Sequence, residues 1–210
     1  MTPVVAVVPL RDGASGKSRL SAHLTPQERR ALVVALARHV LGTLAAYPFD
    51  EILVVTADPE FTAEVVGEVL VPVSVLAEPP GRHGLNAALD AAREHVRATT
   101  WGARLLVAHA DLPLLAVDDV DALVRETADV VIAPDRHGTG TNLLLLPADD
   151  DFTFRFGPGS RTAHEAEAAR GGWRLAVVQR PSTAADLDTL DDLAELAGLA
   201  GLAGLADLAH

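Results

Sequence analysis

The sequence contains no cysteine, so disulfide bridges and thiolate metal sites are excluded. It has no apolar run near the ~20 residues that a membrane-spanning helix requires. The start of the chain also lacks the basic flank and the cleavage site of a signal peptide. Lysine is nearly absent, because Lys17 is the single lysine among the 17 Lys and Arg residues. We therefore expect a soluble, cytoplasmic protein with no membrane partner.

The 210 residues are enough for one domain with a sizeable core. A net charge of −12 disfavours broad nucleic-acid binding, which depends on neutralising many phosphates with cationic side chains. Residues 1–30 are nevertheless basic, since they hold five cationic and two acidic side chains. A basic patch on an acidic protein suits a small anionic ligand better than a polymer.

An apolar run over residues 4–8 leads into a glycine-bearing loop that carries Arg11, Lys17 and Arg19. Backbone N–H groups and a lysine in such a loop can converge on a phosphate. The loop is not a Walker A motif, because Arg11 stands where that motif needs its first glycine. We interpret it as a phosphate-binding loop of another kind, and a surface loop with an idle lysine is the alternative.

Apolar, β-branched runs alternate with helical patterns along the chain, which predicts parallel strands with helices on both faces of a sheet. The first helix should begin after Thr25, because Pro26 and Glu28 complete a capping-box pattern there. The expected strands are 4–8, 51–56, 71–76, 104–108, 130–133, 143–146 and 173–179, and the later expected helices are 61–70, 87–99, 117–127 and 162–170.

Carboxylates follow two of the expected strands. Asp111 comes just after the run 104–108, where open α/β sheets bind ligands. Asp186 and Asp188 follow the last strand and share one face if their segment is extended. Carboxylate oxygens suit Mg²⁺, which bridges to nucleotide phosphates. The alternatives are ordinary: Asp111 could cap the turn at Pro113, and the other two could cap a following helix.

Glycine and hydroxyl residues form a second candidate anion site. Gly157 and Ser160 lie just before a predicted helix, whose first N–H groups could bind an anion together with the Ser160 hydroxyl. An ordinary glycine turn with a helix cap is the equal alternative. The segments around Thr141 and at 84–86 are weak signals taken singly, and His164 has no metal-ligand spacing, so we assign it a structural or surface role.

Taken in order, these pieces resemble the phospholactate/phosphoenolpyruvate guanylyltransferase family of coenzyme F-420 biosynthesis. The resemblance covers roughly residues 4 to 193. It is carried by Pro9-Leu10, Gly16-Lys17-Ser18-Arg19-Leu20, Leu85-Asn86, Ala110-Asp111-Leu112-Pro113, Gly140-Thr141-Asn142, Phe156-Gly157 with Gly159-Ser160 and His164, Asp186-Leu187-Asp188 and Asp191-Asp192-Leu193.

The resemblance implies a single-domain nucleotidyltransferase fold of the GT-A-like, Rossmann-like α/β class with a mostly parallel sheet. It implies that GTP and a three-carbon phospho-acid react, that pyrophosphate leaves, and that Mg²⁺ assists, expected as two ions. Lys17 and Asp111 would be catalytic. The remaining implied roles are nucleotide binding by Arg11, Lys17, Arg19, Gly84, Leu85 and Asn86, acid binding by Thr141, Gly157 and Ser160, and metal binding by Asp111, Asp186 and Asp188.

The high arginine and alanine content favours a bacterial gene of high GC content, for which the resemblance points to phosphoenolpyruvate. The acceptors 2-phospho-L-lactate and 3-phosphoglycerate stay open, as do another nucleotidyltransferase of this fold and a non-catalytic nucleotide-binding module. The sequence leaves the oligomeric state and the preference for GTP over ATP undecided. We expect residues 1–193 to form the catalytic domain. Residues 194–210, a Leu/Ala/Gly repeat, should form a helical or frayed tail.

Overall fold

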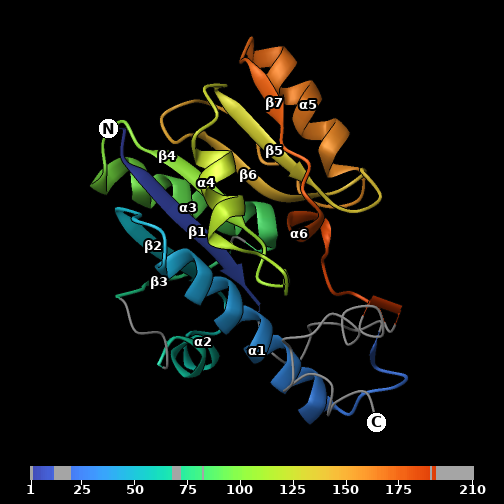
Figure 1. Ribbon diagram of the computed structural model, residues 1–210. Coiled ribbons are helices and arrows are strands. Elements are labelled where there is room, and N and C mark those ends of the chain that lie inside the picture. Colours follow the sequence, from blue (N-terminus) through green and yellow to red (C-terminus); the bar gives the residue numbers. More distant parts are fainter. Residues whose placement is uncertain (1, 12–19, 68–71, 82, 190, 193–210) are drawn as a thin grey trace.

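A seven-stranded sheet flanked by helices forms the protein (Figure 1). The computed structural model describes residues 2–11, 20–67, 72–81, 83–189 and 191–192. The strands are β1 (Val4–Leu10), β2 (Glu51–Thr56), β3 (Ser74–Ala77), β4 (Arg104–Ala108), β5 (Val130–Pro134), β6 (Thr141–Pro147) and β7 (Leu175–Val177). The helices are α1 (Pro26–Ala45), α2 (Pro59–Val66), α3 (Leu85–Thr99), α4 (Val117–Val124), α5 (Ser160–Gly171) and α6 (Pro181–Ala184).

The strand order is β3-β2-β1-β4-β6-β5-β7, and all pairings that do not involve β6 are parallel. Strand β6 runs antiparallel to both β4 and β5, with Ala108 opposite Leu143 and Ile132 opposite Leu144. The reason is local, because only six residues separate β5 from β6, too few for the crossover that a parallel pair needs. The predicted α/β class with a mostly parallel sheet is confirmed.

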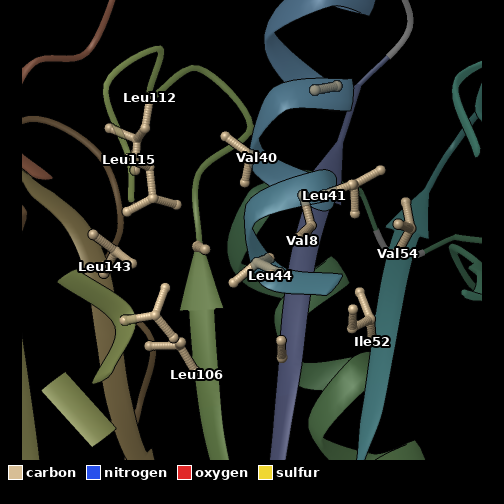
Figure 2. Packing of buried hydrophobic residues seen from close by; sticks show 14 of the residues in the cluster. Val8, Val40, Leu41, Leu44, Ile52, Val54, Leu106, Leu112, Leu115 and Leu143 are labelled. Carbon is tan, nitrogen blue, oxygen red and sulfur yellow. The ribbon is translucent and has the colours of Figure 1, made fainter. Parts of the chain in front are cut away.

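The five central strands of the sheet, β2, β1, β4, β6 and β5, are buried on both faces. Side chains alternate along a strand, so Ala6 and Val8 of β1 face one core while Val5 and Val7 face the other. Helices α1, α2 and α4 cover the first face, and Figure 2 shows Val40, Leu41 and Leu44 of α1 packed over β1 and its neighbours. Helices α3 and α5 cover the second face together with Phe152, Phe154 and Phe156.

Helix α1 begins where the capping pattern predicts. The Thr25 hydroxyl accepts from the Glu28 backbone N–H, and the Glu28 carboxylate accepts from the Thr25 backbone N–H in return. Two of the orphan N–H groups at the helix start are thereby satisfied. The buried residues Leu32, Leu36 and Val40 recur at helical spacing and belong to the buried face of α1.

Several predicted boundaries are wrong by a few residues. Helix α2 ends at Val66 because Gly67 caps it, and α4 ends at Val124 instead of 127. Strand β7 spans three residues instead of seven, and the short helix α6 was not predicted. The boundary at 193 and the predicted tail 194–210 lie outside the described residues. None of the helices in the described part of the chain is long and apolar enough to cross a membrane.

Candidate active site

The candidate site lies at one edge of the sheet, where the parallel strands β1, β4, β5 and β7 end. Strand β6 begins at this edge because it runs the opposite way. Residues that follow β4 and β5, precede β6 and follow α6 therefore come together there. This is the edge at which open α/β sheets bind ligands, as the position of Asp111 in the sequence predicts.

Three aspartates meet at this edge. The backbone N–H of Leu187 donates to the Asp111 carbonyl at 3.1 Å, which fixes the segment of Asp186 and Asp188 beside the end of β4. Burial raises the pKa of Asp186, and the negative charges of Asp111 and Asp188 raise it further. The Asn142 amide donates to the Asp186 carboxylate at 3.4 Å, which partly offsets this effect.

The three predicted metal ligands are therefore electrostatic neighbours. Within the described ranges, however, no group of three or more His, Asp or Glu side chains is arranged to hold a metal ion by itself. This arrangement still fits Mg²⁺, which commonly takes only one or two protein carboxylates and fills its shell with water and substrate phosphates. The chemistry of the donors also fits Mg²⁺, because carboxylate oxygens are hard ligands and a cation relieves their mutual repulsion.

A small leucine cluster fixes the segment that carries Asp186 and Asp188. Leu187 is fully buried and packs with Leu20 and Leu24, which follow the predicted phosphate loop, and with Leu32 and Leu36 of α1. The side chain between the two aspartates is thus anchored, and Asp186 and Asp188 remain only partly buried. The cluster also places Leu20, the first described residue after the loop, beside the carboxylates.

A pocket of about 660 Å³ opens at the same edge. It is lined by five aspartates, one arginine, one histidine and a set of small or hydroxyl-bearing residues, among them Asp186, Asp188 and Gly157 of the predicted site. With His137 neutral, these charges sum to −4. An anionic substrate entering such a pocket needs cations to accompany it.

Arg136 is a pocket residue that the sequence reasoning missed. Its guanidinium donates to the Asp186 carbonyl at 2.7 Å and pairs with the Asp192 carboxylate at 2.8 Å. Asp192 in turn accepts the backbone N–H groups of Asp188 and Thr189 at 2.8 and 2.7 Å. Arg136 thereby connects the loop after β5 to the aspartate segment. Its position two residues after the buried strand β5 is the signal by which the sequence could have indicated it.

The predicted acid-binding residues lie beside the pocket. Gly157 lines it, with a positive φ of 134° that L side chains rarely adopt. Ser160 is the first residue of α5 and is 2% exposed, while Gly159 takes the cap position with φ 73°. Thr141 begins β6, is 2% exposed and follows the pocket residue Gly140. Gly157 thus lies in the pocket wall, and Thr141 and Ser160 each follow a residue of that wall, Gly140 and Gly159.

Asn86 has a structural partner that the sequence did not reveal. Its side-chain oxygen accepts the Phe156 backbone N–H at 2.8 Å, and its amide nitrogen donates to the Phe156 carbonyl at 3.1 Å. The start of α3, with Gly84 and Leu85, is thereby clamped to the Phe156–Ser160 turn. The predicted nucleotide segment and the predicted acid segment are joined directly.

The basic loop is only partly described. Arg11 is exposed at the end of β1, on the edge where the aspartates meet. Lys17 and Arg19 lie outside the described residues, so their assignment to the nucleotide phosphates stays a prediction. The roles of Gly84 and Leu85 likewise stay predictions.

The α/β fold is shared with solved nucleotidyltransferases. A solved nucleotidyl transferase from a Methanothermobacter species superposes with a TM-score of 0.66 at 20% identity, over 93% of this chain and 96% of that one. At that identity, the likeness shows the fold alone.

The family is established by sequence. Residues 4–201 match the family described as "Guanylyl transferase CofC like", and the chain belongs to this family. It is similar to the phosphoenolpyruvate guanylyltransferase of Sphaerobacter thermophilus, with 39% identity over 88% of each chain. It is similar to the enzyme of that name from Rubrobacter xylanophilus, with 39% identity over 89% of each. The resemblance inferred from the motifs is confirmed.

Proposed function

We propose that this protein transfers the guanylyl group of GTP to phosphoenolpyruvate, releases pyrophosphate, and acts in coenzyme F-420 biosynthesis. The observation that carries the proposal is the group of Asp111, Asp186 and Asp188 at the ligand-binding edge of a chain that belongs to the guanylyltransferase family. The choice of phosphoenolpyruvate follows the names of the relatives. Because both substrates are intracellular metabolites, we place the reaction in the cytoplasm.

The reaction joins two anions. A phosphate oxygen of phosphoenolpyruvate attacks the α-phosphorus of GTP, and the bond from that phosphorus to the bridging oxygen of pyrophosphate breaks. The nucleophile is already an anionic oxygen, so no general base is required. Catalysis then depends on holding the reactants in line and on neutralising their charge.

The aspartates would hold Mg²⁺, as two ions. When bound, Mg²⁺ supplies positive charge to phosphate oxygens. Asp186 is the strongest candidate ligand, because its pKa is raised by burial and by two neighbouring carboxylates, and a cation relieves that repulsion. Arg136 holds the Asp186 backbone in place through its 2.7 Å hydrogen bond.

The chain's other residues would position the substrates. We assign the nucleotide phosphates to Arg11, Lys17 and Arg19, with Lys17 acting at the reacting phosphates. The guanosine would lie along Gly84, Leu85 and Asn86. On the acid side, we assign binding to Gly157, whose turn lines the pocket, and to the Ser160 hydroxyl at the start of α5. A helix start of this kind favours an anion.

A coupled pyrophosphate assay tests the proposal. Purified protein is given GTP or ATP with Mg²⁺ and one of phosphoenolpyruvate, 2-phospho-L-lactate or 3-phosphoglycerate. We expect rapid release with GTP and phosphoenolpyruvate, and none when EDTA removes the metal. Faster pyrophosphate release with 2-phospho-L-lactate would show that this acid, and not phosphoenolpyruvate, is the acceptor. Binding of GTP without pyrophosphate release with any of the acids would indicate a non-catalytic module.

The variant Asp186→Asn tests the metal role against a matched control. We expect at least a 100-fold loss of rate, on the order of the loss for one charge-stabilising group. Asp151→Asn makes the same chemical change at a carboxylate that is 99% exposed and should leave the rate unchanged. A rate for Asp186→Asn within threefold of the wild type would contradict the assignment.

A further inference from the structure

His164 is a buried polar residue to which the proposed reaction assigns no role. It lies on α5 with 0% of its surface exposed, and its ring packs against Phe156 and Phe152 at centroid distances of 4.7 and 5.7 Å. Both ring nitrogens are engaged. Nδ1 lies 3.1 Å from the Thr141 hydroxyl, and Nε2 lies 3.0 Å from the backbone nitrogen of Arg155.

These two contacts fix the position of the ring proton. A backbone N–H can only donate, so Nε2 must be the acceptor and carries no hydrogen. The ring is neutral at physiological pH, because burial lowers the pKa of His164 to about 4, with a smaller contribution from His109 and an opposing one from Glu167. The single ring proton is therefore on Nδ1, and Nδ1–H donates to the oxygen of Thr141.

The hydroxyl of Thr141 is oriented as a result. Its oxygen accepts from His164, so its own hydrogen is left to donate elsewhere. Its bond with His164 is the one side-chain hydrogen bond that Thr141 makes to other described residues. Thr141 begins β6 and directly follows Gly140, which lines the acidic pocket together with Gly157.

We propose that His164 is a positioning residue: it fixes the Thr141 hydroxyl as a hydrogen-bond donor to the anionic phospho-acid. This inference rests on the proposed function, since it concerns how that site recognises its acceptor substrate. Carboxylate and phosphate oxygens only accept hydrogen bonds. With the opposite tautomer, Thr141 would have to donate to His164 and would present lone pairs to the anion. The tautomer thus decides whether this hydroxyl attracts or repels the substrate.

The surroundings hold the ring in this state. Phe156 packs against His164, and its backbone is clamped at both polar groups by Asn86. The adjacent residue Arg155 supplies the N–H that Nε2 accepts. The segment 155–160, to which we assign binding of the acid, therefore also sets the tautomer of His164.

Two substitutions at His164 separate the two contacts. His164→Asn places an amide nitrogen near the Nδ1 position and can still donate to Thr141. His164→Gln reaches the Nε2 position and keeps an acceptor for Arg155 but loses the donor to Thr141. We expect His164→Gln to raise KM for phosphoenolpyruvate roughly ten- to hundredfold. KM for GTP should change less than threefold, and His164→Asn should recover most of the affinity.

Substitutions at the hydroxyl provide the matched comparison. Thr141→Val should behave like His164→Gln, and Thr141→Ser, which keeps the hydroxyl, should recover most of the affinity that Thr141→Val loses. The double variant of Thr141→Val and His164→Gln should be no worse than either single variant, because each alone already abolishes the oriented Thr141 hydroxyl. Equal increases in KM for GTP and for phosphoenolpyruvate would indicate a merely structural role and overturn the proposal, as would additive losses in the double variant.

A spectroscopic measurement decides the tautomer without any turnover. Long-range ¹H–¹⁵N NMR of the wild-type protein should show the His164 ring protonated at Nδ1 and unprotonated at Nε2 at pH 7. A ring protonated at Nε2 would overturn the inference. If the wild type released no pyrophosphate with any acid, the proposed function would fail. The inference would then be judged by this spectrum and by calorimetric binding of phosphoenolpyruvate, whose absence would also overturn it.

Discussion

Replacing Asn86 with alanine should lower the free energy of unfolding by about 2–4 kcal/mol. The substitution removes both hydrogen bonds to the Phe156 backbone, at 2.8 and 3.1 Å. Each bond contributes about 1 kcal/mol net, and an unpaired group in a buried position costs about 1–3 kcal/mol. Phe156 is only 8% exposed, so water replaces the lost partners poorly.

Urea denaturation followed by circular dichroism measures this change. The midpoint should fall while the m-value stays constant, because the same surface is exposed on unfolding. Asn86→Asp is the informative second variant, since it keeps the acceptor for the Phe156 N–H but sets a carboxylate oxygen against the Phe156 carbonyl. Its loss should be similar in size. Gln27→Ala, at an exposed position of α1, is the control and should change stability by less than about 0.5 kcal/mol.

The result distinguishes two roles for Asn86. If the side chain acts only on the guanosine, Asn86→Ala raises KM for GTP and leaves the unfolding midpoint unchanged, which would refute the clamp. If the clamp is correct, the midpoint falls and KM for phosphoenolpyruvate rises too, because the turn that begins at Phe156 loses its fixed position.

Three further predictions concern stability. Between pH 6.5 and 4 the unfolded chain protonates His164 while the folded chain does not, because burial lowers its folded pKa to about 4. Stability should therefore fall by up to ~3 kcal/mol as the pH drops through this window, and His164→Gln should remove that loss in urea titrations. Thr25→Ala should cost about 0.5–2 kcal/mol, since it removes the capping box of α1. Asp119→Asn should cost about 1–3 kcal/mol, because Asp119 is 1% exposed and pairs with Arg180.

Each of these has a result that would contradict it. A pH profile of His164→Gln that matches the wild type would place the loss of stability above pH 4.5 on groups other than His164 and Glu167. The pKa of Glu167 is lowered to about 2, mainly by its hydrogen bond with Arg170, so its contribution disappears only below pH 4.5. If Thr25→Ala and Asp119→Asn had the same melting temperature as the wild type, the helix cap and the ion pair would contribute nothing to stability.

Local signals account for the parts of the fold that the sequence predicted well. Strands β2 and β4 were predicted with their observed bounds, because each is a continuous apolar run between polar or turn-forming residues. The start of α1 was found from three residues, Thr25, Pro26 and Glu28, whose capping interactions are local. Such features need no knowledge of distant contacts.

The errors in the predicted strands arise where contacts with residues far away in the sequence decide the structure. Strand β7 is short because it pairs on one side only and its Leu175 and Val177 remain exposed, so its apolar run overstates its length. The reversed direction of β6 follows from the short connection after β5, a constraint on chain length and not on residue type.

The candidate site likewise combines features that the local sequence predicts with features that depend on distant contacts. The positions of Asp111 and Asp186 after strands predicted their meeting at the sheet edge. The roles of Arg136, Asn86 and His164 depend on partners 50, 70 and 23 residues away. A local pattern can indicate that Arg136 lies at the end of a strand, but it cannot indicate which distant residues these side chains contact.

Isotope labelling of GTP tests the central claim most directly. With phosphoenolpyruvate, Mg²⁺ and [α-³²P]GTP, the proposed reaction carries the label into a new guanylylated acid. With [γ-³²P]GTP, the label appears in pyrophosphate. Label from the γ position in inorganic phosphate or in the acid, with none from the α position in a new product, would contradict guanylyl transfer.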